Sequence, residues 1–370
     1  INYRIEKARL ARHALTQGGR LAPSDAEKDQ RLLDQITALE RDYLTKTEAL
    51  ERLHKEAGQE VLFLTVSTGR SVRLSLDQVL AVSRPNGMHW GEKLLAYVQS
   101  LWLFVSTEPR EANTEGGIFP AIFGTVLMVF LMTLAVMPFG VMAAVYLREY
   151  ANQGLLVRLV RIAVNNLAGV PSIVFGVFGL AFFVYALGGT IDQWLFPEAL
   201  PNPTFGTGGI LWASLTLALL TVPVVIVATE EGLSAVPRDF REGSLGLGAT
   251  KFETLRHVIL PCALPGILTG LILAMARAAG EVAPLMLTGV VKLAPALPLD
   301  EYLPFLHLDR KFMHLGFHIY DVGFQSPNVE AAKPMVYMTT LILILVVVLL
   351  NWAAVRLRNR LRRRFTASAV

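Results

Sequence analysis

Five apolar stretches are each long enough to cross a lipid bilayer, which takes about 20 residues in a helix. They lie at about 118–147, 160–187, 209–229, 263–290 and 335–355. Of the 370 residues, 53% are hydrophobic and 17% are charged, whereas soluble proteins carry about 25% charged residues. A soluble all-α core would not explain so many stretches of this length. The sequence therefore predicts an all-α polytopic membrane protein and argues against a soluble enzyme.

Lysine and arginine in the short loops predict the orientation of these spans, because cytoplasmic loops are enriched in both. Two arginines lie between the first and second spans and a third, Arg161, lies at the start of the second, while three arginines and a lysine lie between the third and fourth. Six more arginines follow the fifth span, whereas residues 188–208 contain neither residue type. We therefore expect the C-terminus to be cytoplasmic and residues 1–117 to be extracytoplasmic.

Residues 1–107 are predicted to form an extracytoplasmic α+β domain. Apolar residues at heptad spacing predict a helix over 24–58, either packed on its own domain or part of a coiled coil. Strand-like segments at 61–66 and 71–76 flank a turn containing Gly69, which is typical of a hairpin. An amphipathic stretch at about 89–105 is predicted to lie on the membrane surface.

The chain begins with Ile1 and shows no signal peptide. Because an exported domain needs a membrane anchor before it, we expect a first transmembrane helix ahead of this fragment. The full protein would then have six spans and both ends in the cytoplasm.

The cytoplasmic loop at 230–262 is much longer than a plain connector between two membrane helices needs to be. Pro237 is suited to start a short helix, and three glycines after it permit a tight turn. A second helix is expected from about Lys251 to Leu260 and Pro261. This helix–turn–helix favours a surface that a partner protein grips, although a loop lying flat on anionic lipid headgroups stays an alternative.

This loop resembles the EAA signature of ABC-importer permeases, with both alanines replaced by other small residues. The matching positions are Glu242, Gly243, Ser244, Gly248, Val258, Leu260 and Pro261. The resemblance implies the MetI-like importer permease fold for residues 108–370. It also implies that the loop forms a coupling helix seated in a groove of an ATPase subunit.

Two ionisable residues, Arg277 and Glu281, fall inside the fourth apolar stretch and are four residues apart. Charged groups are costly in the hydrocarbon region and usually face a bundle interior or a water-filled path. A guanidinium suits an oxyanion because its planar fork donates paired hydrogen bonds to phosphate. The chemistry alone leaves a mutually neutralising structural pair as an equal alternative.

Further motifs resemble the PstA family of phosphate-importer permeases. They are the segment around Arg277 that continues to Leu285, the Asn-Thr-Glu-Gly-Gly run at 113–117 and the Pro-Ser-Ile-Val run at 171–174. This resemblance implies that Arg277 meets phosphate on its path with Glu281 as its ionic neighbour. Asn165, Asn166 and Ser172 are candidate hydrogen-bond donors, with packing against other helices as the favoured interpretation.

Other chemistries are weakly indicated. His307, His314 and His318 include two at metal-ligand spacing, but an interfacial segment containing histidines is favoured over a metal site. The arginines at 356–364 directly follow a membrane span, so they indicate orientation rather than nucleic-acid binding. The only cysteine, Cys262, cannot form an internal disulfide. No Walker A pattern occurs, so we expect no cofactor in this chain, with ATP and Mg²⁺ held by a partner ATPase.

The resemblance predicts a permease subunit of an ATP-driven phosphate importer in the bacterial inner (cytoplasmic) membrane. Its implied partners are a PstC-like permease, an ATPase dimer, an extracytoplasmic phosphate-binding protein, inorganic phosphate and membrane lipid. Two alternatives stay open at this point: a permease for another oxyanion such as sulfate or molybdate, and a membrane signalling or scaffold protein with an outer sensory domain.

Overall fold

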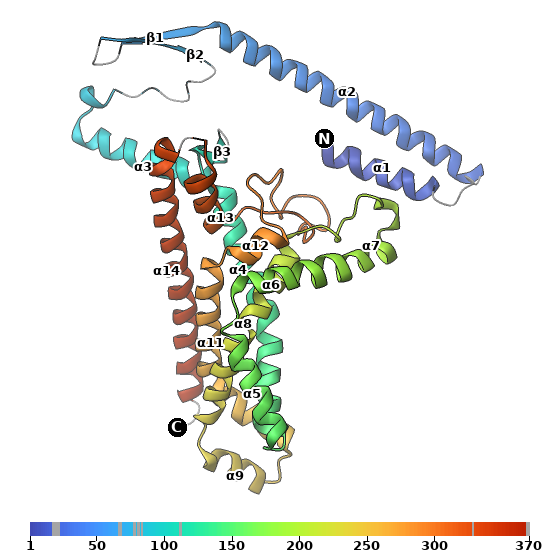
Figure 1. The fold of residues 1–370 in the computed structure, drawn as a ribbon, viewed down its shortest axis with the longest axis vertical. Coiled ribbons are helices and arrows are strands. Elements are labelled where there is room, and N and C mark those ends of the chain that lie inside the picture. The colour runs from blue at the N-terminus through green and yellow to red at the C-terminus, as the bar shows by residue number, and fades with distance from the viewer. Residues whose placement is uncertain are drawn as a thin grey trace. The chain divides into compact units, whose positions relative to one another are not determined.

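The computed structural model describes residues 1–16, 23–65, 69–76, 79, 82, 84–110, 113–327 and 329–367 (Figure 1). These residues form two compact units. The first unit combines Ile1–Gln99 with Gln193–Pro203, and the second combines Ser100–Asp192 with Thr204–Val370. The first unit thus ends a few residues before the boundary expected at 107, and it includes part of a loop that we assigned to the membrane domain.

The first unit contains a short helix, α1 (Asn2–Thr16), packed against a long helix, α2 (Pro23–Gln59). Ile5, Ala8 and Ile36 form the buried contact, which Leu32 and Leu39 flank. The expected apolar seam of α2 is therefore packed within its own domain over its first half. The later seam residues are exposed because α1 is too short to cover them; they are Tyr43, Leu50 and Leu53.

The rest of the first unit contains a hairpin followed by a short turn. Strands β1 (Val61–Thr65) and β2 (Ser71–Ser75) pair antiparallel, with Leu62 opposite Leu74. Gly69 has a φ of +81°, as the expected turn requires; the predicted turn residues 67 and 68 lie outside the described residues. The 3₁₀ turn Pro85–Gly87 follows and leads into helix α3 (Trp90–Ser106).

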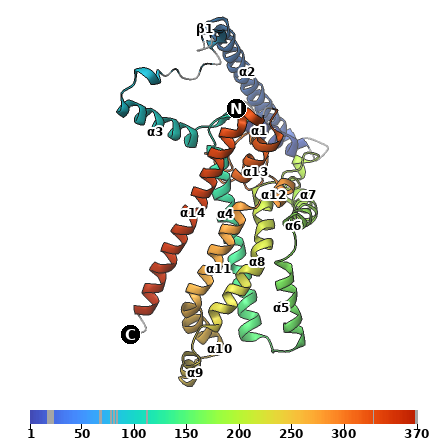
Figure 2. The same cartoon turned by 60° about the vertical axis from the view of Figure 1, so that its left-hand side comes forward.

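Four long helices dominate the second unit. They are α4 (Phe119–Val145), α8 (Ile210–Ser234), α11 (Leu260–Gly280) and α14 (Val329–Ala367). Helices α4 and α11 both pack on α8, and α14 packs on α11 (Figures 1 and 2). The short hairpin β3 (Pro109–Arg110) and β4 (Glu115–Gly116) precedes α4.

Within the described residues, five helices are long and apolar enough to cross a membrane. Their bounds are Phe119–Tyr150, Ser172–Leu195, Ile210–Ser234, Lys251–Gly280 and Ala332–Arg360. The number of spans agrees with the sequence analysis, and three of the five also agree closely in position. The second and fourth differ.

The second predicted span, 160–187, is broken. Helix α5 (Leu155–Leu167) ends before residues 168–171, and a new helix begins with α6 (Ser172–Phe178) and continues through a π-helical stretch into α7 (Gly189–Leu195). Pro171 lacks the N–H that a continuous helix needs and restricts the residue before it. As a result α5 runs along the bundle, whereas the helix that starts at α6 runs across it (Figures 1 and 2).

The fourth predicted span, 263–290, is shifted toward the cytoplasmic loop. A single helix runs from α10 (Lys251–Thr254) through a π turn (Leu255–Ile259) into α11, so Pro261 does not end a helix there. Pro261 lies in the first turn of α11, where proline is tolerated. The helix stops at Gly280 because Glu281 is extended (ψ 135°), and the short helix α12 (Ala283–Thr288) then begins.

Helix α8 lies at the centre of the second unit. In its apolar window 67% of the residues are buried, compared with 33% or less in the other four spans. Gly232 on α8 lies against Gly266 on α11, where an added Cβ at Gly266 would sit 2.6 Å from the Gly232 Cα atom. Small residues of this kind let membrane helices approach closely.

We expect the substitution Gly266→Ala to push α8 and α11 apart and to destabilise the folded chain by about 1–3 kcal/mol. The measurement is the thermal unfolding temperature of the purified protein in detergent. Gly189→Ala is the matched control, because nothing lies within 4 Å of a Cβ added there. An equal unfolding temperature for the two variants would contradict this account of the helix contact.

Candidate functional site

The loop at 230–262 forms the expected helix–turn–helix. Helix α9 (Arg238–Gly246) begins after Pro237, and Gly248, with a φ of +88°, turns the chain toward α10. Thr250 and Glu253 cap α10 reciprocally: the Thr250 N–H donates to Glu253 Oε2 (2.8 Å), and the Glu253 N–H donates to Thr250 Oγ1 (3.3 Å). These contacts give the projecting loop a defined shape.

The two helices of this loop are joined to each other, while their outer face stays exposed. The hydroxyl groups of Ser244 and Thr254 lie 2.9 Å apart and form a hydrogen bond between α9 and α10. Glu242, Gly243 and Gly248 are exposed. Large apolar side chains on the same loop are exposed as well; they are Phe240, Leu245, Leu247 and Phe252. An apolar face next to a carboxylate is suited to a protein partner.

Leu260 and Pro261 belong to a different part of the molecule from the exposed loop residues. Both are half-buried in the first turn of α11, and Leu260 packs against a buried cluster that includes Leu233 and Ile259. They therefore connect the loop to the bundle rather than form part of its exposed face.

One guanidinium attaches the loop to the ends of two membrane helices, and the sequence analysis did not single it out. Arg241 Nη1 donates to both carboxylate oxygens of Glu149, at 2.7 and 2.8 Å, and Arg241 Nη2 donates to the Leu233 carbonyl at 2.8 Å. Glu149 lies in the π turn Tyr146–Tyr150 that ends the first span, and Leu233 lies in the last turn of α8. A cation near a helix C-terminus is also favoured by the helix dipole.

A second arginine makes a similar connection nearby. Arg161 on α5 lies 3.1 Å from Glu230 on α8, and its guanidinium also donates to the Leu147 carbonyl. Glu149 and Glu230 could have drawn attention as the acidic residues among cytoplasmic arginines. Nothing in a linear pattern indicates, however, that residues 92 apart in the chain would pair.

The predicted Arg277–Glu281 pair is present, although the two residues do not share a continuous helix. Arg277 lies in the last turn of α11, and Glu281 lies just beyond the end of that helix. The Arg277 Nε and Glu281 Oε1 atoms are 3.6 Å apart, and the two side chains are 35% and 22% exposed. The guanidinium therefore keeps donors available to a bound anion.

The position of Arg277 along α11 differs from the mid-membrane position that the predicted span 263–290 implied. Twenty residues separate it from His257, which lies in the π turn near the start of the same helix. At about 1.5 Å per residue this corresponds to about 30 Å, which is the thickness of the hydrocarbon core. Arg277 thus lies near the end of the span that is farthest from the loop at 230–262.

The other predicted path residues lie apart from this pair. Asn165 and Asn166 are exposed near the end of α5, and Ser172 is half-buried at the start of α6. Among the described residues, Arg277 forms its ion pair with Glu281 and with none of these three. Helix α6 does pack against α12, where Gly176 closely approaches Pro284. The structure therefore brings the helix of Ser172, but not the asparagines, to the segment that follows Glu281.

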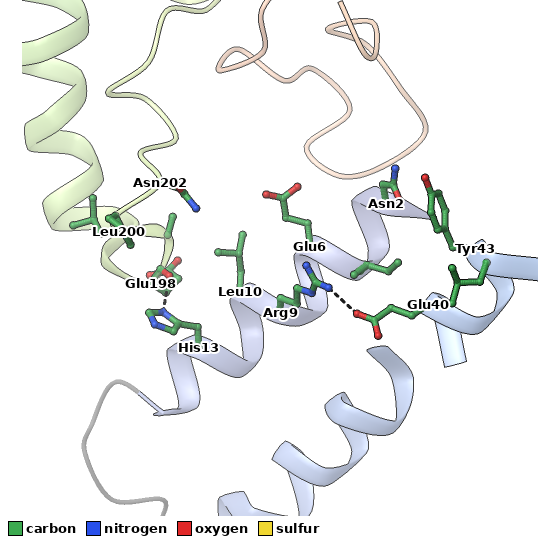
Figure 3. A pocket seen from close by; sticks show the side chains of 14 residues that line it. Asn2, Glu6, Arg9, Leu10, His13, Glu40, Tyr43, Glu198, Leu200 and Asn202 are labelled. Carbon is green, nitrogen blue, oxygen red and sulfur yellow. Dashed lines mark hydrogen bonds and ion pairs between the residues drawn. The ribbon is translucent and has the colours of Figure 1, made fainter. Parts of the chain in front are cut away.

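A groove of about 790 Å³ lies in the first unit, between α1, α2 and the turn Pro197–Ala199 (Figure 3). His13 Nδ1 donates to the Glu198 carbonyl at 2.7 Å, and Arg9 pairs with Glu40 at 2.6 Å. Because the groove also contains Glu6, its carboxylates outnumber its cations. This composition does not suit an anion such as phosphate.

The three histidines considered for metal binding have different side-chain partners in the structure. His307 Nε2 lies 3.0 Å from Asp300, His314 caps helix α13 (Leu315–Tyr320), and His318 lies within that helix beside Thr339. Among the described residues, no group of three or more His, Cys, Asp or Glu side chains is arranged to hold a metal ion.

Two of these histidines are held neutral by burial. Burial lowers the pKa of His314 to about 3. Burial, and secondarily Lys292, lowers the pKa of His318 to about 4, while Asp321 opposes the shift. Lys292 and Asp321 form an ion pair of 3.0 Å, and Asn113 donates to the Lys292 carbonyl at 2.8 Å. The Asn-Thr-Glu-Gly-Gly motif therefore joins a buried polar cluster near the start of α4.

Comparison with known proteins gives consistent matches. The family model for the "Binding-protein-dependent transport system inner membrane component" matches residues 136–363. "Probable ABC transporter permease protein YqgI" of Bacillus subtilis (strain 168) is 31% identical over 270 residues, which cover 72% of this chain and 85% of that protein. "Phosphate transport system permease protein PstA 1" of Mycobacterium tuberculosis (strain ATCC 25618 / H37Rv) is 34% identical over 250 residues, covering 67% and 72%. Among solved structures, a chain of the inward-facing MetNI methionine ABC transporter is similar at 19% identity, with coverage of 71% and 98% and a TM-score of 0.49.

Reversing one charge of the Arg241–Glu149 pair is expected to destabilise the attachment of the loop by about 1–3 kcal/mol, because the remaining partner is left half-buried without its counterion. Arg241→Glu and Glu149→Arg should each lower the unfolding temperature, and the double exchange should restore most of the loss. Double-mutant analysis of thermal unfolding measures this coupling. Purely additive effects would show that the two side chains do not interact.

The buried histidines predict a loss of stability in mild acid. In the unfolded chain a histidine binds a proton below about pH 6.5, whereas folded His314 and His318 stay neutral down to about pH 3 and about pH 4. The two neutral histidines therefore contribute fully to the free energy of unfolding above about pH 6.5. As the pH falls below that value, each histidine lowers the free energy of unfolding by about 1.4 kcal/mol per pH unit. Comparing unfolding temperatures at pH 7.5 and pH 5 in the wild type and in a His314→Gln, His318→Gln variant tests this. The variant should lose less stability on acidification than the wild type.

Proposed function

Because the chain belongs to the family of binding-protein-dependent transport system inner membrane components, we propose that it is the permease subunit of an ATP-driven importer of inorganic phosphate. Family membership confirms the predicted fold class, an all-α polytopic membrane protein of the MetI-like importer permease type. It does not favour the signalling or scaffold protein that the sequence alone left open.

The observation that carries the phosphate assignment is the half-exposed guanidinium of Arg277, held in the last turn of α11 beside Glu281. Charge-assisted hydrogen bonds from a guanidinium to phosphate are among the strong ones available to a protein. Glu281 keeps the site close to electrically neutral when no anion is bound, which lowers the cost of holding a charge near the membrane. Relatives named as phosphate permeases support the same anion.

The exposed face of α9 and α10 is the proposed seat for an ATPase dimer. Glu242, Gly243 and Gly248 lie on that face, and Arg241 transmits its movement to the first span and to α8. ATP and Mg²⁺ belong to the partner in this proposal. A second, PstC-like permease would complete the path, and an extracytoplasmic binding protein would deliver phosphate to the end where Arg277 lies.

The first unit is proposed to be extracytoplasmic, in a bacterial inner-membrane protein. Helix α1 packs on the turn Pro197–Ala199, and the His13–Glu198 hydrogen bond joins the two (Figure 3). That turn belongs to the loop 188–208, which contains no lysine or arginine and is therefore expected outside. Packing and loop charge thus support the same side of the membrane.

We expect Arg277→Ala to lower phosphate uptake by at least about tenfold, because it removes charge-assisted hydrogen bonds of about 1.5–3 kcal/mol. The measurement is uptake of labelled phosphate into vesicles that contain the chain with its partner permease, ATPase and binding protein. Arg360→Ala, an exposed arginine of the cytoplasmic tail, is the matched control and should transport normally. Full uptake by Arg277→Ala in an assembled complex would contradict the role of this residue.

Competition distinguishes phosphate from the runner-up substrates. Unlabelled phosphate should abolish uptake of labelled phosphate, while equal concentrations of sulfate or molybdate should leave it unchanged. Stronger competition by sulfate or molybdate than by phosphate would favour the other oxyanion.

A further inference from the structure

Helix α3 exposes large apolar side chains along its length. None of its residues is buried. Seven of its apolar side chains are between 53% and 82% exposed; they are Trp90, Leu94, Leu95, Tyr97, Val98, Trp102 and Leu103. Soluble proteins rarely expose so continuous an apolar surface unless something covers it.

These side chains are distributed unevenly around the helix axis. At 100° per residue, the positions that share one face with Trp90 are 94, 97, 98, 101 and 105, and all of them are apolar. The polar residues Glu92, Gln99 and Ser106 gather on the opposite face, where Leu95 and Leu103 flank Gln99. Helix α3 is therefore amphipathic, with a wide apolar face.

The C-terminal end of α3 is fixed at the start of the first membrane span. The Ile118 N–H donates to the Phe104 carbonyl at 2.9 Å, and the Phe119 N–H donates to the Thr107 carbonyl at 3.1 Å. Phe104 and Val105 also pack against a cluster that contains Ile118 and Met313. Because Phe119 is the first residue of α4, the last turn of α3 lies where the chain enters the membrane.

We propose that α3 lies in the outer leaflet interface of the membrane and that lipid covers its apolar face. The occupant follows from continuity, since the last turn of α3 adjoins the exposed apolar surface that α4 presents to lipid. Trp90, Tyr97 and Trp102 are the amphipathic aromatic residues that favour the headgroup region. The chain thereby gains an anchor parallel to the membrane between its outer unit and its first span, beyond the transport role proposed above.

The charges of α3 indicate which lipid headgroups are needed for α3 to bind the membrane interface. The helix contains one acidic and one basic residue, Glu92 and Lys93, so it carries no net charge. Attraction to anionic headgroups therefore contributes little, and apolar burial provides the driving force. The interaction should occur in purely zwitterionic lipid and should be insensitive to salt.

Spin-label accessibility in the full-length chain tests the proposal. Cys262 is the only cysteine, so Cys262→Ser gives a background for single labels at Leu94→Cys and Val98→Cys on the apolar face and at Gln99→Cys on the polar face. The chain is reconstituted in phosphatidylcholine nanodiscs, and relaxation by oxygen, which partitions into lipid, is compared with relaxation by a water-soluble nickel chelate. Gel filtration confirms that each variant is folded.

The expected result is an oxygen-to-nickel accessibility ratio that is severalfold higher at positions 94 and 98 than at position 99, unchanged by 0.5 M salt or by added phosphatidylglycerol. Equal nickel accessibility at all three positions would show that α3 is in water and would overturn the proposal. Protection of positions 94 and 98 from both reagents would overturn it as well, because protein would then cover this face. Repeating the measurement with the partner permease present identifies which protein does so.

Discussion

Backbone contact between small residues at the α8 crossings holds the transmembrane unit together. Lipid tails are as apolar as leucine, so helices gain little by hiding apolar side chains from them and associate instead through close packing. Gly266 meets Gly232 on α8, and Gly140 of α4 closely approaches the side chain of Val225 on α8. These contacts hold α4 and α11 against α8, and α11 connects the loop at 230–262 to Arg277 at its far end.

Much of this fold was predictable because the solvent constrains it. In lipid every backbone polar group must be satisfied within the helix, so length and hydropathy were enough for the number of spans and for α4, α8 and the span in α14. The β1–β2 hairpin was predictable for a local reason, since its turn required a residue with positive φ. For α2, the apolar seam was predictable from its heptad spacing. The length of α1, which covers only the first half of that seam, was not.

The remaining differences arise where two or more local rules compete. Proline has the lowest helix propensity of all residues, yet of Pro171 and Pro261 only Pro171 interrupts a helix. Pro261 is accommodated because the π turn before it places it in a first turn that needs no N–H donor. The contact between Arg277 and Glu281 was predictable because the two residues are four apart. The sequence did not show that the helix would end at Gly280, between the two. The Arg241–Glu149 pair could not be predicted from the sequence, because it joins segments that only the folded bundle brings together.

The continuous helix Lys251–Gly280 joins the loop that contains α9 directly to the segment of Arg277. Its 30 residues span about 45 Å at 1.5 Å per residue. Such a rod works as a lever: a tilt of about 5° at the loop displaces its far end by about 4 Å for that length. Arg277 and Glu281 lie 3.6 Å apart at that end and move together with it. A displacement of about 4 Å is nevertheless longer than a hydrogen bond of about 3 Å to a group on another helix. A small tilt at the loop is therefore enough to change which groups on other helices the Arg277 guanidinium faces, without bending the helix.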